Sequence, residues 1–106
     1  MAKFIALYKK PANPEEFDRH YFDVHMPLVN KIPGLKRAEI NKIVGGPQGD
    51  SEYYMIATLY FDNMEDLKSG MSSAEGRAAG KDIMGVAAGI VTMMFAEEKI
   101  PATVHS

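Results

Sequence analysis

The sequence predicts an α+β fold of the ferredoxin-like βαββαβ type, with a four-stranded antiparallel sheet and helices on one of its faces. Turn and capping signals divide the chain into strand, helix, strand, strand, helix and strand, which is the split βαβ order. Residues 3–9 and 53–61 are largely apolar on both strand faces, as in the central strands of a covered sheet. A chain of 106 residues, 46% of them hydrophobic, is long enough for one domain. We place that domain at residues 1–98 and a tail at residues 99–106.

The first strand and the start of the first helix are marked by charge and by prolines. Residues 3–9 form an apolar run between charges, which Pro11 closes. A helix follows, because Asn13 can accept a hydrogen bond from the amide of Glu16 in an arrangement that resembles a capping box. Pro14 suits the first helical position, where a missing N–H costs nothing.

The end of this helix is predicted from Pro27. Proline removes a helical donor and biases the preceding residue, Met26, away from helical angles. We therefore expect the helix to end or kink near His25. At about 100° per residue, the stripe that faces the sheet is predicted to contain Phe17, Tyr21, Val24 and Leu28.

Three further segments are predicted as strands. Residues 35–44 alternate weakly, which is typical of a strand with one solvated edge or face. A glycine-rich loop over residues 45–51 separates them from residues 53–61, the strongest strand, rich in β-branched and aromatic side chains. The last strand is predicted over residues 90–96.

Between the strands at residues 53–61 and 90–96 the sequence predicts two helices. Asp62 or Asn63 can cap a short one that runs through Lys68 and is ended by Gly70, and Ser72 or Ser73 can start another over residues 74–86. The second contains three glycines, Gly76, Gly80 and Gly85. These small residues indicate either a close approach of the helix to the sheet or space left for a ligand.

The apolar character of both sheet faces predicts a homodimer. In the first strand Phe4, Ala6 and Tyr8 share one face, and Ile5 and Leu7 share the other. Helices can cover only one of these faces. Because a monomer rarely exposes a large apolar patch, a second copy of the chain is expected to cover the other.

Composition excludes several classes of protein. The net charge of −2 argues against a nucleic-acid surface, and the absence of cysteine excludes disulfides, thiolate metal sites and cysteine nucleophiles. No apolar run approaches the roughly 20 residues that cross a bilayer, and nothing resembles a signal peptide. We expect a soluble, cytoplasmic protein with no nucleic-acid or membrane partner.

The histidines are the first candidates for chemistry. On a regular helix His20 and His25 fall on opposite flanks, and five residues is the wrong spacing for two ligands on one face. With no HExxH motif and no cysteine, we predict no metal. His25, at the predicted break, is either a general acid or base or a residue that binds a freed carbonyl and fixes the kink. His20 is expected at the surface or an interface, and His105 lies in the tail.

Several segments resemble the EthD family. They are residues 7–11 (LYKKP), 17–22 (FDRHYF), 25–28 (HMPL), 32–35 (IPGL) and 76–82 (GRAAGKD). Tyr21 stands where the family often has tryptophan after the first histidine. The resemblance implies a dimeric α+β barrel and a small-molecule cleft between sheet and helices. Lactone isomerases, polyketide cyclases, quinone-forming monooxygenases and haem enzymes are the wider relatives that it implies.

From the residues and this resemblance we predict a site and a function. His25 and Tyr21 are expected to be catalytic, and Tyr8, Tyr60 and His20 to bind the ligand, with no cofactor. The expected activity is acid/base chemistry on a small, mostly apolar, oxygenated metabolite, by isomerisation, cyclisation or oxygen-dependent oxidation. Two alternatives are a non-catalytic binding or accessory protein of a catabolic pathway and a haem enzyme that uses one of the two histidines.

Overall fold

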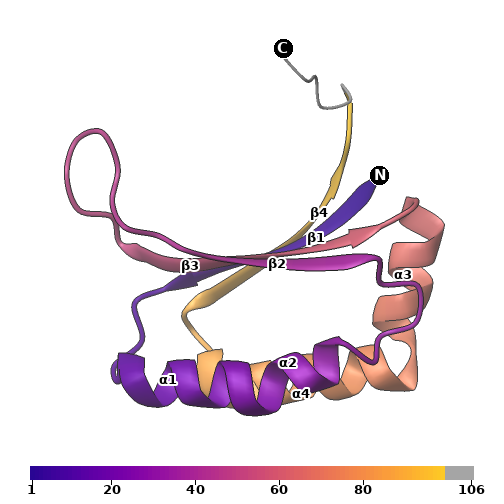
Figure 1. Cartoon of the computed structure of the whole chain (residues 1–106), viewed down its shortest axis with the longest axis horizontal. Helices are drawn as coiled ribbons and strands as arrows, with labels where there is room; N and C mark the ends of the chain where they lie inside the picture. The colour runs from indigo at the N-terminus through magenta and orange to yellow at the C-terminus, as the bar shows by residue number, and fades with distance from the viewer. Residues whose placement is uncertain (100–106) are drawn as a thin grey trace.

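The computed structural model describes residues 1–99, which form a four-stranded antiparallel sheet with helices on one face (Figure 1). The strand order is β2-β3-β1-β4, and every neighbouring pair is antiparallel. This is the ferredoxin-like α+β arrangement that the sequence predicts. The strands are β1 (Ala2–Lys9), β2 (Arg37–Lys42), β3 (Tyr53–Phe61) and β4 (Val91–Glu97). Apart from Lys99, the predicted tail and His105 lie outside the described residues.

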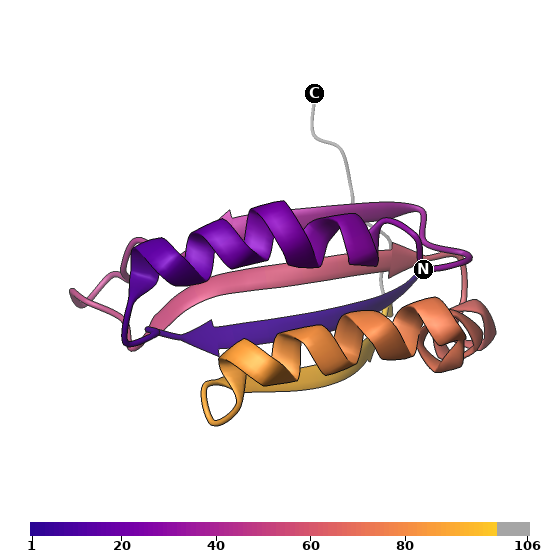
Figure 2. The same ribbon diagram turned by 90° about the horizontal axis from the view of Figure 1, so that it is seen from below.

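Two helical rods lie side by side across the sheet (Figure 2). The first rod comprises three consecutive segments, α1 (Pro14–His20), η1 (Tyr21–His25) and α2 (Met26–Val29). The second rod is α4 (Ala74–Ala87), and α3 (Met64–Ser72) precedes it at one end of the sheet. No helix within residues 1–99 is long and apolar enough to cross a membrane.

Side-chain caps start the three longer helices as the sequence predicts. Asn13 accepts from the amide of Glu16 at 3.2 Å, and Asn63 accepts from the amide of Asp66 at 2.8 Å. Ser73 caps α4 by accepting from the amide of Gly76 at 3.0 Å. Where the sequence offers two candidate caps, Asp62 or Asn63 and Ser72 or Ser73, the residue nearer the helix is the cap.

The prediction that Gly70 ends α3 is wrong, because the helix continues to Ser72. Gly70 is instead buried where α3 meets the chain before β2. A Cβ at this position would lie 2.5 Å from the carbonyl oxygen of Pro33 and 3.0 Å from the ring of Phe61. The glycine permits a close approach of two backbones and does not terminate the helix.

The prediction that Pro27 breaks the helix near His25 is corrected by the segment η1. Met26 keeps helical angles, with φ −61° and ψ −38°, and its N–H donates to the carbonyl oxygen of Tyr21, five residues back. This is one turn of π-helix. In an α-helix the Pro27 ring would collide with the carbonyl of Asp23. The wider turn accommodates the proline, and the helix continues to Val29.

The π turn changes which side chains face the sheet. The buried residues of the rod are spaced by four and are Phe17, Tyr21, His25 and Val29. Val24, predicted to be buried, is 45% exposed. The extra residue in the turn therefore places His25 where a regular helix would place Val24.

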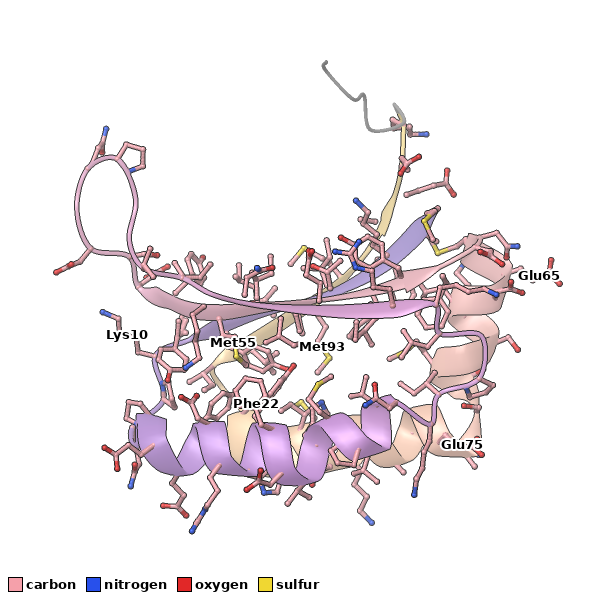
Figure 3. All side chains as sticks on the ribbon, in the orientation of Figure 1. Lys10, Phe22, Met55, Glu65, Glu75 and Met93 are labelled. Atoms are coloured by element: carbon pink, nitrogen blue, oxygen red, sulfur yellow. The ribbon has the colours of Figure 1, made fainter. Side chains whose placement is uncertain are left out.

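The face of the sheet away from the helices is not covered by any described element (Figure 3). We call its apolar centre the open face, formed by Ile5, Leu7, Ile56, Thr58 and Met94. Thr58 is only 8% exposed even in the single chain, because its neighbours on adjacent strands shield it. The sheet is thus apolar on both sides, as the sequence predicts.

Candidate functional site

A cavity of about 300 Å³ lies between the helical layer and the sheet. Most of its wall is apolar, and Figure 3 shows Met93 pointing into this layer from β4. The apolar wall is formed by Phe4, Ala6, Val29, Ile32, Ala57, Leu59, Met71, Ala79, Ile83 and Met93. Three buried polar side chains reach the same cavity, namely Tyr8, Tyr21 and His25. An apolar cavity with a few convergent polar groups is the usual form of a small-molecule site.

The two tyrosines form an aromatic corner at one end of the cavity. Their ring centroids are 5.7 Å apart with the planes nearly perpendicular, and Phe17 packs against both. Burial raises the pKa of Tyr21 to about 12. Burial, together with the adjacent Tyr21, raises the pKa of Tyr8 even further. Both hydroxyls therefore carry their protons at neutral pH and can donate hydrogen bonds to a ligand oxygen.

His25 is held by a carboxylate from the other helical rod. Its Nδ1 lies 3.1 Å from an oxygen of Asp82 on α4. A carboxylate only accepts, so Nδ1 carries the hydrogen and Nε2 of a neutral ring has a free lone pair. His25 is 5% exposed. Within residues 1–99, every fully buried side-chain nitrogen or oxygen has a hydrogen-bond partner. Nε2 makes no hydrogen bond to the described residues, so it is not fully buried, and its ring lines the cavity.

The environment of His25 favours the neutral imidazole. Burial lowers its pKa, and the nearby His20 lowers it further. The hydrogen bond and the charge of Asp82 act in the opposite direction but do not outweigh burial. At neutral pH the ring can therefore accept a proton at Nε2 while Asp82 fixes its orientation.

His20 contacts the same carboxylate from outside the cavity. Its Nε2 lies 3.0 Å from each Asp82 oxygen, and its side chain is 28% exposed. It lines a separate groove of about 540 Å³ on the outer surface, together with Asn13, Glu16 and Arg19. The predicted opposite placement of His20 and His25 is wrong, because the wider π turn between them brings both rings to one carboxylate.

Of the five predicted site residues, the structure brings Tyr8, Tyr21 and His25 to one cavity. His20 is joined to them only through Asp82. Tyr60 projects from the face of the sheet that carries no helices, where its hydroxyl donates to Glu39 at 3.2 Å. Tyr60 does not line the cavity.

Asp82 is the residue of this arrangement that the sequence interpretation did not identify. It lies 57 residues from His25 and 62 from His20, and no local pattern links such distant positions. A carboxylate on a polar helix face is usually solvated. The available signal was the segment over residues 76–82, which resembles the EthD family and ends at this aspartate.

The sequence predicts that the α4 glycines allow a close approach to the sheet, but Gly76 approaches helix α3 instead. A Cβ on Gly76 would overlap the backbone of α3, at 2.6 Å from the carbonyl oxygen of Met71, so this glycine allows the two helices to pack closely. A Cβ on Gly80 would meet no atom within 4 Å. Gly80 lines the cavity and leaves space there.

The described chain contains no group of three or more His, Asp or Glu side chains arranged to hold a metal ion. Asp82 instead acts as a shared hydrogen-bond acceptor for the two histidines. The absence of a metal in the working protein stays a prediction.

Distant solved structures share the fold. The cofactor-independent oxygenase SnoaB of Streptomyces nogalater is 10% identical with a TM-score of 0.69, and the alignment covers 94% of each chain. A dimeric protein of unknown function with a ferredoxin-like fold from Bacteroides fragilis is 20% identical with a TM-score of 0.63, covering 92% of this chain and 95% of the other. At these identities the similarity establishes the architecture.

Closer relatives establish the family. An uncharacterised 11.0 kDa protein from the thcB–thcC intergenic region of Rhodococcus erythropolis is 35% identical over 99 residues, which cover 93% of this chain and 96% of the relative. An EthD family protein from Bacillus halodurans has a crystal structure with 45% identity and a TM-score of 0.90, covering 92% of this chain and 98% of that one. The family model of the EthD domain matches residues 9–89. The chain therefore belongs to the EthD family.

Proposed function

We propose that this protein binds a small, mainly apolar, oxygenated molecule in the cavity and moves a proton on it through His25, without a metal or organic cofactor. The observation that carries the proposal is the position of His25. Its ring is buried at the cavity wall, oriented by Asp82 through Nδ1, with Nε2 left for a ligand. The fold relative SnoaB, a cofactor-independent oxygenase, gives a precedent for such chemistry on this architecture.

In this proposal the other residues have distinct roles. Nε2 of His25 takes a proton from an acidified carbon or hydroxyl of the ligand, and Asp82 stabilises the imidazolium that forms. The protonated hydroxyls of Tyr8 and Tyr21 donate to a ligand oxygen and stabilise negative charge that develops there. Isomerisation, cyclisation and reaction of an activated ring with oxygen all begin with such a step.

The alternative is a binding or accessory protein of a catabolic pathway that uses the same cavity without turnover. Proton exchange on a bound probe separates the two functions. The bicyclic ketone 2-tetralone has acidic hydrogens beside its carbonyl, and their exchange in D2O is followed by NMR. We expect the protein to accelerate this exchange and His25→Asn to reduce the acceleration by about 10²-fold or more, the upper range of general-base effects being about 10⁴-fold.

Asparagine at position 25 keeps a donor and an acceptor but does not titrate, so the unfolding free energy of the variant tells the two roles of His25 apart. A catalytic role leaves stability unchanged. A structural role lowers it by about 1–3 kcal/mol, the cost of disturbing a buried hydrogen bond. Binding of the ketone with no acceleration in the wild-type protein would contradict the enzyme and favour the binding protein.

We also propose that the protein is a homodimer that pairs its open faces. No element within residues 1–99 covers Ile5, Leu7, Ile56 and Met94 on the open face. Burying such a surface stabilises association by roughly 25 cal/mol per Å² of apolar area. Two sheets facing each other would form the dimeric α+β barrel that the resemblance to the EthD family implies.

A further inference from the structure

The charged residues that line the cavity have one sign. Seventeen of residues 1–99 line it, and none of these is an aspartate or a glutamate. Two are cationic, Arg77 and Lys81, both on α4. The ion pairs formed within residues 1–99 involve other residues, so these two cations are available to a ligand.

The two cations stand at the mouth of the cavity. Arg77 and Lys81 are both exposed and one helical turn apart, so their side chains project from the same side of α4. At about 100° per residue this side is the flank of α4 opposite to Asp82. Gly80 lies between them in the sequence, and the space beside its Cα is open. Met93, on the sheet side of the same cavity, is 38% exposed.

The buried end of the cavity has the opposite character. Tyr8, Tyr21 and His25 are each at most 5% exposed, and all three are neutral at pH 7 because burial opposes their charged forms. Between the two ends the wall is aliphatic and aromatic. The cavity thus has a neutral hydrogen-bonding end, an apolar middle and a cationic mouth.

We propose that the ligand of this cavity is an apolar molecule with one anionic group, such as an aromatic or alicyclic carboxylate, whose anion contacts Arg77 and Lys81 while its body fills the apolar middle. Guanidinium and ammonium groups are the usual protein partners of carboxylates. An acidic residue on the wall would repel such an anion, and there is none. This inference rests on the proposed function, since it names the class of molecule that the same cavity binds.

A pair of near-isosteric probes tests the charge requirement. In 2-naphthoate and 2-acetonaphthone the same ring system carries either a carboxylate or a neutral methyl ketone. Binding of each is measured by calorimetry and by NMR shifts of cavity residues. We expect the full-length protein to bind the carboxylate about three- to tenfold more tightly, as two partly solvated ion pairs allow. This preference should shrink as salt concentration rises.

Three variants test which residues cause the preference for the carboxylate. In Arg77→Gln/Lys81→Gln the affinity for the carboxylate should fall to that for the ketone, so that the preference disappears. Lys10→Gln/Lys31→Gln removes the same net charge from positions that do not line the cavity, and it should keep the preference. Gly80→Leu places a side chain in the open space at the mouth and should weaken binding of both probes.

The outcomes separate this inference from the function on which it rests. Equal affinity for the two probes, or a preference that survives in Arg77→Gln/Lys81→Gln, overturns the anionic ligand and leaves the cavity as a binding site. Binding of neither probe, or binding unaffected by Gly80→Leu, overturns the role of the cavity and with it both proposals. A salt-sensitive preference that only the α4 double variant abolishes supports them.

Discussion

At the scale of single residues, Asp82 links two histidines that differ in their environment. His25 is buried at the cavity, whereas His20 is partly exposed on the outer groove. One carboxylate accepts from both rings at 3.0–3.1 Å, so its charge acts on both. The pKa of His25 is consequently a balance between burial, which lowers it, and Asp82, which raises it.

This balance predicts how the titration of His25 responds to substitution. Asp82→Asn retains an oxygen that accepts from Nδ1 but removes the negative charge that favours the imidazolium. The pKa of His25 should therefore fall further below its ordinary value of about 6.5. His20→Gln should shift it in the opposite direction, since protonated His20 disfavours a second positive charge.

The measurement is an NMR titration of the histidine ring protons, assigned by single histidine variants. A rise in the pKa of His25 in Asp82→Asn would contradict the assignment of Asp82 as the residue that orients and stabilises this ring. Similar shifts of the same sign in both variants would indicate a general loss of structure instead.

At the scale of secondary structure, the elements that the sequence predicts well are those set by local signals. Asn13, Asn63 and Ser73 start helices because each caps an amide three residues ahead. The π turn was not predicted, because Pro27 indicates only that the regular pattern fails and not how the backbone adapts. That one turn decides whether Val24 or His25 faces the cavity, so the regular helix misplaced Val24, while His25 was already a candidate for the site.

Two of the three glycines of α4, Gly76 and Gly80, give a prediction at this scale. Gly76→Ala should lower the unfolding free energy by about 1–3 kcal/mol, the range for overpacking, because its methyl group would meet the backbone of α3. Gly80→Ala should raise it by up to about 1 kcal/mol, since alanine favours a helix and the methyl group meets no atom within 4 Å.

Urea unfolding of the two variants measures both changes, and each serves as the control for the other because the substitution and the helix are the same. Equal m-values would show that the unfolded states are comparable. Stabilisation by Gly76→Ala would contradict the close contact between α3 and α4.

At the scale of the molecule, the alternation of side chains along the strands was enough to predict the sheet and its second apolar face. Each strand places successive residues on opposite faces, so the apolar character of both could be derived from β1 and β3 alone. The contacts of Asp82 could not be derived from the sequence, because they depend on how two helical rods pack over that sheet. The cavity wall is likewise assembled from elements at both ends of the chain.

The open face gives the last prediction, which concerns assembly. Light scattering of the purified protein at micromolar concentration should give about twice the chain mass of 11.7 kDa. Ile56→Glu places a carboxylate in the centre of the open face, where pairing of two copies would bury it against its own symmetry mate. This variant should have the mass of a single chain.

Val44→Glu is the matched control for this substitution. It makes the same aliphatic-to-carboxylate change at a side chain that is 97% exposed, in the segment between β2 and β3 and outside the open face. Its mass should stay at twice that of the chain. A wild-type protein that is a stable monomer, or an Ile56→Glu variant that still dimerises, would show that the open face is not the interface. A folded monomeric Ile56→Glu variant would also reveal whether the cavity, which lies on the other side of the sheet, binds its ligand without a partner.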